Sequence, residues 1–210
     1  RCGALKIGAR TYLCIHGGLN IEPVMNSAAT HLQTGIGGVQ GRALKKDDAL
    51  AITPLPLHNA LRPLRARAEA QNYLREKNLL RLTRGPQAVF FSPSAFDILT
   101  STPYLVTESS NRVGLRLKGE ALARTNQTEM LTEGISCGAV QVPSEGQPII
   151  LFVEHPTTGG YPKIAHVITA DLPRVGQLRP RDEVRFQLVS LEEARELYLA
   201  QEEFVQRRSF

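Results

Sequence analysis

The stretch from Val153 to Thr169, VEHPTTGGYPKIAHVIT, holds residues that together can stabilise a negatively charged oxygen. The backbone N–H groups of Gly159 and Gly160 can converge on an anionic oxygen as a nest. Lys163, a little further along the chain, would place a positive charge beside that oxygen. Groups arranged in this way polarise a carbonyl and stabilise the oxyanion that forms when an amide or ureido group reacts.

The same stretch also offers groups that transfer protons and groups that bind a substrate. Glu154 and His155 can each move a proton, so we take them, with Lys163, as the catalytic candidates. Hydroxyl groups that can hydrogen-bond a substrate come from Thr157, Thr158 and Tyr161. With the two glycines, these residues form the expected substrate-binding part of the stretch.

Two neighbouring segments add side chains suited to planar polar groups. SSNRVG carries Asn111 and Arg112 on a polar turn, and a guanidinium binds a carboxylate or ureido group in a bidentate way. GAVQVPSEGQP carries Gln141 and Gln147, whose amides both donate and accept hydrogen bonds. We expect these four residues to position the substrate, although each of them taken singly is also an ordinary residue of a surface turn.

A purely structural interpretation of the opening stretch stands beside the catalytic one. The runs QPIILFVE and YPKIAHVIT are apolar and strand-like, and HPTTGG joins them. Glycine pairs are frequent in tight turns because glycine accepts positive φ at no steric cost. A plain hairpin explains the glycines, whereas the threonines, the lysine and the acid–base pair exceed what a hairpin needs. The residues leave both interpretations open.

The composition of the 210-residue chain favours a mainly β fold. Hydrophobic residues make up 42% and aromatics 6%, with 17 glycines and 13 prolines, a mixture typical of many short strands and turns. Cys2, Cys14 and Cys137 are far apart, so they predict neither a disulfide framework nor a metal site and fit reduced thiols in the cytoplasm. The histidines show no metal-ligand spacing, so no metal is expected.

Neither nucleic acid nor membrane is an expected partner. The net charge is +5, but the basic residues are scattered and form no long block, no zinc-finger spacing and no RNP-like aromatic run. No apolar run approaches the roughly 20 residues that span a bilayer. The chain begins at Arg1 without a methionine and enters a strand-like pattern almost at once, so we expect part of the first domain to lie upstream.

Three parts of the chain differ in character. Residues 1–55 read as the C-terminal part of an N-terminal β-rich domain, with a hairpin expected over Ala4 to Gly18. Residues 56–84 are rich in proline and then in basic helix formers, which favours a linker. Residues 85–210 read as a second domain of strands with a few helices.

Two helices of the second domain have clear start signals. Ser92 followed by a proline predicts a short helix in SPSAFDILTSTP. Ser190, with Glu193 at the capping-box position, predicts a helix over SLEEARELYLAQEEFVQRRSF, with Leu197 and Phe204 on its buried stripe. Few helices among many short strands point to a barrel or a pair of sheets.

Five motifs are long and specific: RTYLCIHGGLN, GIGGVQGRAL, SNRVGLRLKG, GAVQVPSEGQPI and TTGGYPKIA. Together they resemble the carboxyltransferase subunit 2 family, which is also described as allophanate hydrolase subunit 2-like. The family includes the C subunit of 5-oxoprolinase, the Kip antagonist proteins and the carboxyltransferase region of urea carboxylase. The resemblance covers nearly the whole chain and implies a cyclophilin-like β-barrel preceded by part of a second β-rich domain.

The resemblance implies three kinds of function. The first is a component of an ATP-dependent 5-oxoprolinase complex, which opens a small cyclic amide, 5-oxoproline, to glutamate. The second is a biotin-dependent carboxyltransferase that acts on urea or a related amide with biotin on a carrier. The third is a non-enzymic regulator that antagonises a kinase inhibitor. We favour the first because no biotin-attachment motif occurs before the sequence ends at Phe210.

The resemblance also implies partner subunits. Members of the family work with a homologous subunit 1, which resembles the B subunit of 5-oxoprolinase or the Kip inhibitor. A protein that resembles the A subunit of 5-oxoprolinase is expected as well. The complex uses ATP, and the site is expected to form between matched subunits. Glu154 stands where many relatives are expected to have an aspartate.

Overall fold

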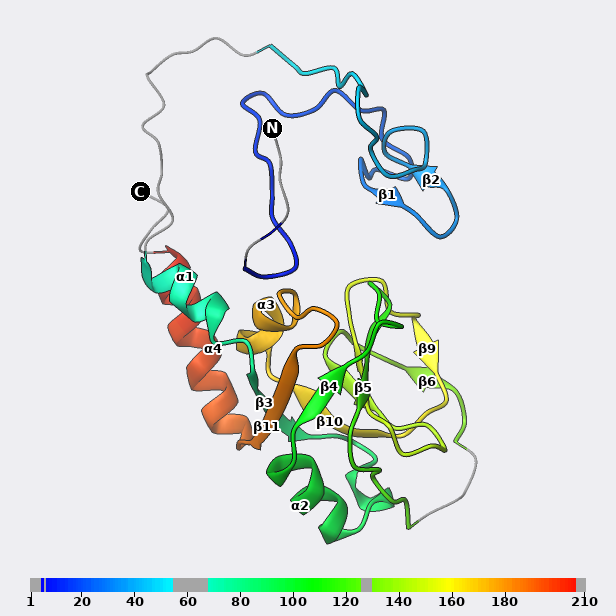
Figure 1. Ribbon diagram of the computed structural model, residues 1–210, viewed down its shortest axis with the longest axis vertical. Helices are drawn as coiled ribbons and strands as arrows, with labels where there is room; N and C mark the ends of the chain where they lie inside the picture. Colours follow the sequence, from blue (N-terminus) through cyan, green and yellow to red (C-terminus); the bar gives the residue numbers. More distant parts are fainter. Residues whose placement is uncertain (1–4, 6, 55–67, 126–129, 207–210) are drawn as a thin grey trace. The chain divides into compact units, whose positions relative to one another are not determined.

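The structure, a computed structural model, describes residues 5, 7–54, 68–125 and 130–206 (Figure 1). The chain divides into two compact units. One unit is Thr11–Arg65, and the other joins Arg1–Arg10 to Ala66–Phe210. The first part of the predicted linker, residues 56–67, lies outside the described residues.

The described residues of Thr11–Arg65 contain two short strands and several turns. Strands β1 (Thr30–His31) and β2 (Ile36–Gly37) pair antiparallel. An isolated bridge joins Leu19 to Ile52. Turns and side-chain bonds therefore hold this unit together more than a sheet does.

The hairpin expected over Ala4 to Gly18 is wrong, because its described residues form no strand. The backbone N–H groups of Ala9 and Arg10 instead donate to Oε1 of Gln177 at 3.0 and 3.3 Å. These contacts attach the first residues of the chain to the second unit, where the prediction had placed them in the first domain.

The second unit is a closed barrel, which confirms the mainly β prediction. Its strands follow the order β10-β3-β11-β4-β5-β8-β7, and β7 pairs back with β10. Only the β3–β11 pair is parallel among the strand pairs of the described barrel. The strands are β3 (Leu79–Arg84), β4 (Tyr104–Val106), β5 (Gly114–Lys118), β7 (Ala139–Gln141), β8 (Ile149–Leu151), β10 (Lys163–Val167) and β11 (Glu183–Leu188).

Alternation of apolar and polar residues explains which side of each strand faces the barrel interior. In β3 the side chains of Leu80 and Leu82 are fully buried, and in β11 those of Val184 and Phe186 are buried in the same way. Because side chains alternate between the two faces of a strand, the arginines between these residues point outward. The closed barrel leaves no free sheet edge along its strands.

Strand β3 corrects the predicted linker, which extended to residue 84. The run LLRLTR reads as the end of a basic segment, yet it pairs with β10 and β11 in the middle of the barrel. Helix α1 (Ala68–Arg75) precedes it within the same range. The barrel therefore begins at Leu79, because two apolar residues at period two suffice for a strand that has neighbours on both sides.

Both predicted helix starts are confirmed. Helix α2 (Pro93–Ser101) begins after Ser92, whose Oγ accepts the N–H of Ala95 at 3.2 Å. Helix α4 (Leu191–Gln206) begins after Ser190, whose Oγ accepts the N–H of Glu193 at 3.0 Å. A short helix α3 (Leu172–Val175) and two single turns, η1 (Ala88–Phe90) and η2 (Thr169–Asp171), complete the described helical elements.

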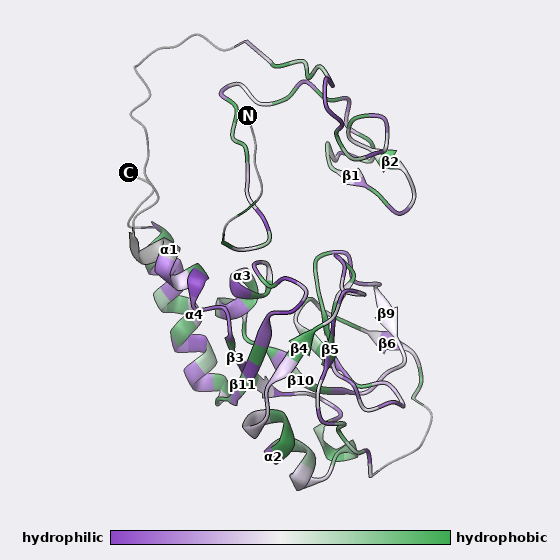
Figure 2. Ribbon diagram, in the orientation of Figure 1, coloured by the Kyte–Doolittle hydropathy of each residue, from purple (hydrophilic) through white to green (hydrophobic). Residues whose placement is uncertain are grey.

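The two longer helices differ in what they cover. Figure 2 shows α2 as mainly hydrophobic, and its Phe96 and Leu99 are buried in the barrel core. Helix α4 alternates hydrophilic and hydrophobic residues, and its Leu197 and Phe204 are half-buried along a groove shared with Tyr73 of α1. The predicted stripe therefore faces the other elements, although no residue of α4 is fully buried.

Candidate functional site

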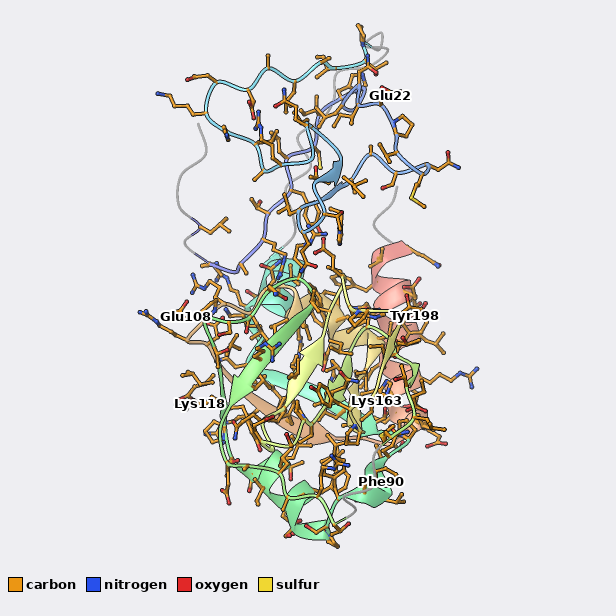
Figure 3. The ribbon with its side chains drawn as sticks, turned by 90° about the vertical axis from the view of Figure 1, so that its right-hand side faces the viewer. Glu22, Phe90, Glu108, Lys118, Lys163 and Tyr198 are labelled. Carbon is orange, nitrogen blue, oxygen red and sulfur yellow. The ribbon has the colours of Figure 1, made fainter. Side chains whose placement is uncertain are left out.

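Lys163, the first residue of β10, is buried and paired. Only 3% of the residue is exposed, and Figure 3 shows it within the body of the barrel unit. Its ammonium forms an ion pair with the carboxylate of Glu133 and donates to the carbonyl oxygen of Gly134 at 3.4 Å. The Glu133 side chain is 40% exposed, so the pair is closed on the lysine side and open to solvent on the glutamate side.

Gln87 completes this group, which we call the Lys163 cluster (Lys163, Glu133 and Gln87). Its Nε2 donates to Oε1 of Glu133 at 2.7 Å, and its Oε1 accepts the backbone N–H of Lys163 at 3.2 Å. The hydrogen bond from Lys163 is the largest of the causes that hold the pKa of Glu133 below its ordinary value. The hydrogen bond from Gln87 lowers the pKa in the same direction but by less. The carboxylate is therefore ionised at neutral pH and fixes the direction of the ammonium group.

Gly85 allows Gln87 to reach the cluster. Its N–H donates to the carbonyl oxygen of Ile164 at 2.9 Å, and a Cβ at this position would lie 2.3 Å from the carbonyl oxygen of Lys163. Real Cβ atoms do not approach a backbone oxygen so closely, so only glycine fits here. The turn after β3 can thus fold against the start of β10.

A bulge in β10 brings Lys163 and His166 to one side of the strand. Against β7, Lys163 faces Gln141 and His166 faces Ala139, with a register shift between Lys163 and Ala165. Residues three apart lie on opposite faces of a regular strand, and one extra residue reverses that relation. Both side chains therefore point toward the same connecting segment, residues 133–136.

His166 lies in an electropositive and partly buried position. Its Nδ1 is 3.5 Å from Oγ of Ser136, and its buried Nε2 has no hydrogen-bond partner in the described part of the chain. Burial, and then the charge of Lys163, lower the pKa of His166. The imidazole is therefore neutral at neutral pH.

The hairpin interpretation of the opening stretch is wrong, because β7 lies between β8 and β10 in the barrel. We call the connecting residues 153–162 the strap. The strap contributes a strand of its own, β9 (Thr158–Gly159), which pairs with β6 (Glu133–Gly134). Glu133 stands opposite Gly159, so the partner of Lys163 and the predicted substrate loop belong to one small sheet (Figure 1).

The strap does not form the expected nest. Neither Gly159 nor Gly160 has the positive φ that a nest requires. The carbonyl oxygen of Thr157 accepts the N–H of Ile135 at 3.1 Å, as expected in a β ladder. The hydroxyl-bearing residues of the strap are all exposed: Thr157, Thr158 and Tyr161. Their side chains are therefore open to a small molecule or to another protein surface.

Gln141 attaches the strap to the barrel. The residue is 5% exposed, and its Nε2 donates to the carbonyl oxygen of Tyr161 at 3.2 Å. A Cβ at Gly159 would lie 3.1 Å from that Nε2 and 3.3 Å from Cδ1 of Ile135. A side chain at position 159 would therefore have to push the ends of these two side chains aside by a few tenths of an ångström.

Arg112 and Glu154, predicted separately, are brought together. Their side chains form an ion pair with Nε 2.8 Å from Oε1, and the N–H of Glu154 donates to the carbonyl oxygen of Arg112 at 2.9 Å. His155 follows, with Nδ1 2.8 Å from the carbonyl oxygen of Pro156. These contacts fix the beginning of the strap, whereas the Lys163 cluster lies at its end.

Two further predicted residues have clear structural contacts. Oδ1 of Asn111 accepts the N–H groups of Val113 and Gly114 at 2.9 and 3.3 Å, which closes the turn before β5. Gln147 exchanges two hydrogen bonds with the backbone of Gly119, at 2.9 and 3.1 Å. Gln147 therefore joins two loops, and its side-chain amide is engaged away from both the strap and the Lys163 cluster.

Sequence reasoning missed Glu133 and Gln87. They lie 46 residues apart in the chain, and Gln87 lies 76 residues before Lys163. Only the closure of the barrel brings them together. The one local signal was the isolated glutamate in TEGIS, next to a glycine and ahead of an apolar strand.

The described residues contain no group of three or more histidine, cysteine, aspartate or glutamate side chains arranged to hold a metal ion. Within those same residues, no helix is both long and apolar enough to cross a bilayer. The Lys163 cluster itself offers a buried cation, an ionised carboxylate and the amide of Gln87. A positive charge is strongest where water is excluded, so the ammonium of Lys163 is well placed to stabilise a developing oxyanion.

A family described as carboxyltransferase domain, subdomain A and B, matches residues 1–188. The chain belongs to this carboxyltransferase domain family. It is similar to the C subunit of 5-oxoprolinase from Escherichia coli, with 40% identity over 89% of this chain and 58% of the relative. The C subunit of 5-oxoprolinase from Haemophilus influenzae is also similar, with 36% identity over 91% of this chain and 60% of the relative. The chain thus spans about three fifths of the length of these relatives.

More distant similarity extends to larger proteins. The urea amidolyase of Lachancea kluyveri is 29% identical over 95% of this chain and 12% of its own length. The solved structure of the Kluyveromyces lactis urea amidolyase matches with a TM-score of 0.80 and 26% identity, over 95% of this chain and 13% of that one. The architecture of the chain is therefore that of one region of such enzymes.

Proposed function

We propose that the chain serves as the C subunit of an ATP-dependent 5-oxoprolinase, a hydrolase complex that opens 5-oxoproline to glutamate. The observation that carries this proposal is the Lys163 cluster, a buried ammonium group held in place by a carboxylate and an amide. The two relatives that are 40% and 36% identical are named as the C subunit of 5-oxoprolinase. The complex uses ATP.

Lys163 polarises the amide carbonyl of the substrate. The carbonyl oxygen approaches from the side of Glu133, which is open to solvent, and takes one hydrogen bond of the ammonium group. The positive charge then stabilises the oxyanion more than it stabilises the neutral carbonyl, which lowers the barrier. Glu133 and Gln87 keep the ammonium group in position throughout.

The strap positions the substrate beside this charge. The exposed hydroxyls of Thr157, Thr158 and Tyr161 supply hydrogen bonds, and Gln141 holds the strap close to the barrel. The Arg112–Glu154 pair fixes the other end of the strap. His155 is exposed enough at this end to exchange a proton with a bound substrate.

The active form is a complex with a homologous subunit 1, which resembles the B subunit of 5-oxoprolinase or the Kip inhibitor. A protein that resembles the A subunit of 5-oxoprolinase completes it. The open side of the Lys163 cluster and the exposed strap are the surfaces on which a matched subunit would complete the site. We place the complex in the cytoplasm, where the free thiols of Cys14 and Cys137 stay reduced.

The test is ATP-dependent release of glutamate from 5-oxoproline by the purified complex. Lys163→Met, which keeps a long apolar stem, is expected to lower turnover by well over tenfold, equivalent to more than about 1.4 kcal/mol in the barrier. Lys118→Met is the matched control, because Lys118 is exposed on β5 (Figure 3) and is expected to leave turnover unchanged. Equal turnover of Lys163→Met and wild type, at equal complex affinity, would remove Lys163 from the site.

A biotin-dependent carboxyltransferase is the second candidate. The fold match to the Kluyveromyces lactis urea amidolyase, with its TM-score of 0.80, favours it. The same charge at Lys163 would stabilise the oxyanion of a ureido or amide group that takes up a carboxyl group. Carboxylation of urea with bicarbonate and a biotinylated carrier, without glutamate release, would select this function. A stable complex that is silent in both assays would instead support a regulatory role.

A further inference from the structure

We propose that a cavity at one mouth of the barrel binds a small organic carboxylate, at a site separate from the Lys163 cluster. The cavity has a volume of about 330 Å³ and lies between the segment Gly8 to Arg10 and strands β4 and β5. Pockets that bind small molecules begin at roughly this size. None of the described residues that line it belongs to the Lys163 cluster or to the strap.

The charge of the cavity wall selects an anion. Arg10 and Arg179 both line it, and the lining residues include no carboxylate side chain. The guanidinium group of Arg179 has no hydrogen bond or ion pair to any residue that the structure describes. The nearby carboxylate of Asp182 is instead engaged by Lys77 and by the backbone N–H of Arg179 at 2.6 Å. A positive charge at the wall of the cavity thus remains available to a ligand.

Arg10 is held in place before any ligand arrives. Its guanidinium lies 4.9 Å from the ring centroid of Phe152 and donates to the carbonyl oxygen of Gly176. Gly8 has φ of 72°, and a Cβ there would lie 2.3 Å from Oε1 of Gln177, the atom that accepts the N–H groups of the two following residues. A fixed binding segment loses little entropy when a ligand binds, which favours affinity.

Asn111 supplies a third donor. Its Oδ1 is occupied by the N–H groups of Val113 and Gly114, so the amide is oriented with Nδ2 as its remaining group. Nδ2 can only donate. Asn111 lines the cavity together with the two arginines. The guanidinium group of Arg179 and the amide N–H of Asn111 form a donor set that suits a planar carboxylate, and the guanidinium of Arg10 adds positive charge to the wall.

The rest of the wall requires a carbon body on the ligand. Six lining residues are apolar: Leu5, Ala9, Val106, Leu115, Leu178 and Pro180. Leu5 and Pro180 are exposed, so a small ring or short chain would cover them, whereas an inorganic anion would leave them in contact with water. Val106, Leu115 and Leu178 are already buried beneath them. The cavity therefore fits a carboxylate on a compact apolar body better than it fits phosphate.

The experiment measures binding of four probes to the full chain by calorimetry, with backbone amide NMR to locate the site. The probes are cyclopentanecarboxylate, 5-oxoproline, 2-pyrrolidinone and inorganic phosphate. The two carboxylates are expected to bind and to shift the amides around Arg179 and Asn111, whereas 2-pyrrolidinone, which lacks the carboxylate, is not. Binding of phosphate as tight as that of the carboxylates would overturn the assignment of ligand class.

Two variants test the site itself. Arg179→Gln removes one guanidinium group and is expected to weaken carboxylate binding by about tenfold or more, since a charge-assisted hydrogen bond is lost. Asn111→Asp keeps the oxygen that closes the turn but places a negative charge at the cavity, so it is expected to abolish binding. Arg181→Gln is the matched control, because Arg181 is 84% exposed, pairs with Glu108 and does not line the cavity.

Unchanged affinity in Arg179→Gln, or amide shifts confined to the strap, would overturn the proposal. Each variant is checked for folding by its amide spectrum before binding is measured. The result is independent of the proposed reaction, because glutamate release depends on Lys163 in the complex and probe binding depends on Arg179 in this chain. A silent enzyme that still binds carboxylates here would refute the first proposal and support the second.

Discussion

Lys163 and His166 lie on the same side of β10 although their positions are three apart, because the register against β7 shifts between Lys163 and Ala165. The bulge places an ammonium group and an imidazole beside one connecting segment, residues 133–136. Burial and the charge of Lys163 both lower the pKa of His166, in that order of size. His166 therefore reports on the charge at position 163.

The first prediction concerns the titration of His166. In the folded protein its pKa lies below the ordinary value of 6.5, and Lys163→Met is expected to raise that pKa because one of the two causes is removed. The ring proton signals of the histidine, followed by NMR against pH, measure it. Burial remains in the variant, so the pKa is not expected to reach the value of an exposed histidine.

The same shift predicts a dependence of stability on pH. A group whose folded-state pKa is lowered contributes stability above its unfolded pKa and loses it as pH falls through the folded value. The free energy of unfolding should therefore decline as pH falls below 6.5, and it should decline less steeply in His166→Gln.

An equal pKa of His166 in wild type and in Lys163→Met would contradict the finding that the two side chains lie on the same side of β10. Lys118→Met serves as the control for loss of one positive charge.

The second prediction is an asymmetry between the two partners of the buried ion pair. Glu133→Ala leaves the ammonium of Lys163 buried without its carboxylate, which is expected to cost about 1–3 kcal/mol of stability. Lys163→Met leaves only the exposed carboxylate of Glu133, which water can solvate, so the expected cost is below about 1 kcal/mol. Urea unfolding at neutral pH measures both.

The conservative variant separates charge from packing in this pair. Glu133→Gln keeps the size of the side chain and an oxygen that can accept a hydrogen bond from the ammonium, so it should be more stable than Glu133→Ala. A larger loss for Lys163→Met than for Glu133→Ala would mean that the packing of the lysine stem outweighs the buried charge.

Features set by adjacent residues could be predicted from the sequence. Ser92 and Ser190 each cap a helix as expected, because a cap needs only a side-chain oxygen and an N–H two or three residues later. The barrel also followed from composition and from resemblance. The strand at Leu79–Arg84 did not, because two basic residues in a six-residue run hide a strand whose partners lie far along the chain.

The candidate site shows the same division. Lys163, Gln141 and the residues of the strap were chosen as candidates from their residue types, whereas Glu133 and Gln87 were missed because barrel closure alone brings them to the lysine. The hairpin was wrong for a related reason. Periodicity identifies two strands but not whether a third strand is inserted between them, and β7 is inserted here.

The third prediction tests a helix cap. Ser92→Ala removes the oxygen that accepts the N–H of Ala95, and is expected to lower the free energy of unfolding by about 1 kcal/mol. Ser94→Ala is the matched control, since the hydroxyl of Ser94 contacts that of Ser92 itself, at 2.7 Å. Thermal unfolding of the two variants compares them. An equal loss in both would show that the hydroxyl pair, and not the cap, stabilises the start of α2.

The fourth prediction concerns the two glycines of the strap. A Cβ on Gly159 would press on Gln141 and Ile135, at 3.1 and 3.3 Å, whereas at Gly160 the nearest atom would be 3.7 Å away, an ordinary contact. Gly159→Ala should therefore weaken the bond from Gln141 to the carbonyl oxygen of Tyr161 and loosen the strap, and Gly160→Ala should not. The expected cost for Gly159→Ala is about 1 kcal/mol, that of one hydrogen bond.

Hydrogen exchange at two amides measures the loosening directly. Ile135 donates its N–H to Thr157, near the middle of the strap, and Val142 donates its N–H to Pro162, at the end of the strap, both at about 3 Å. Both amides should exchange faster in Gly159→Ala and at the wild-type rate in Gly160→Ala, because local opening exposes them. If the proposed function holds, glutamate release should fall in parallel with this protection. Equal protection of both amides in the two variants would mean that the strap does not depend on its close approach to Gln141.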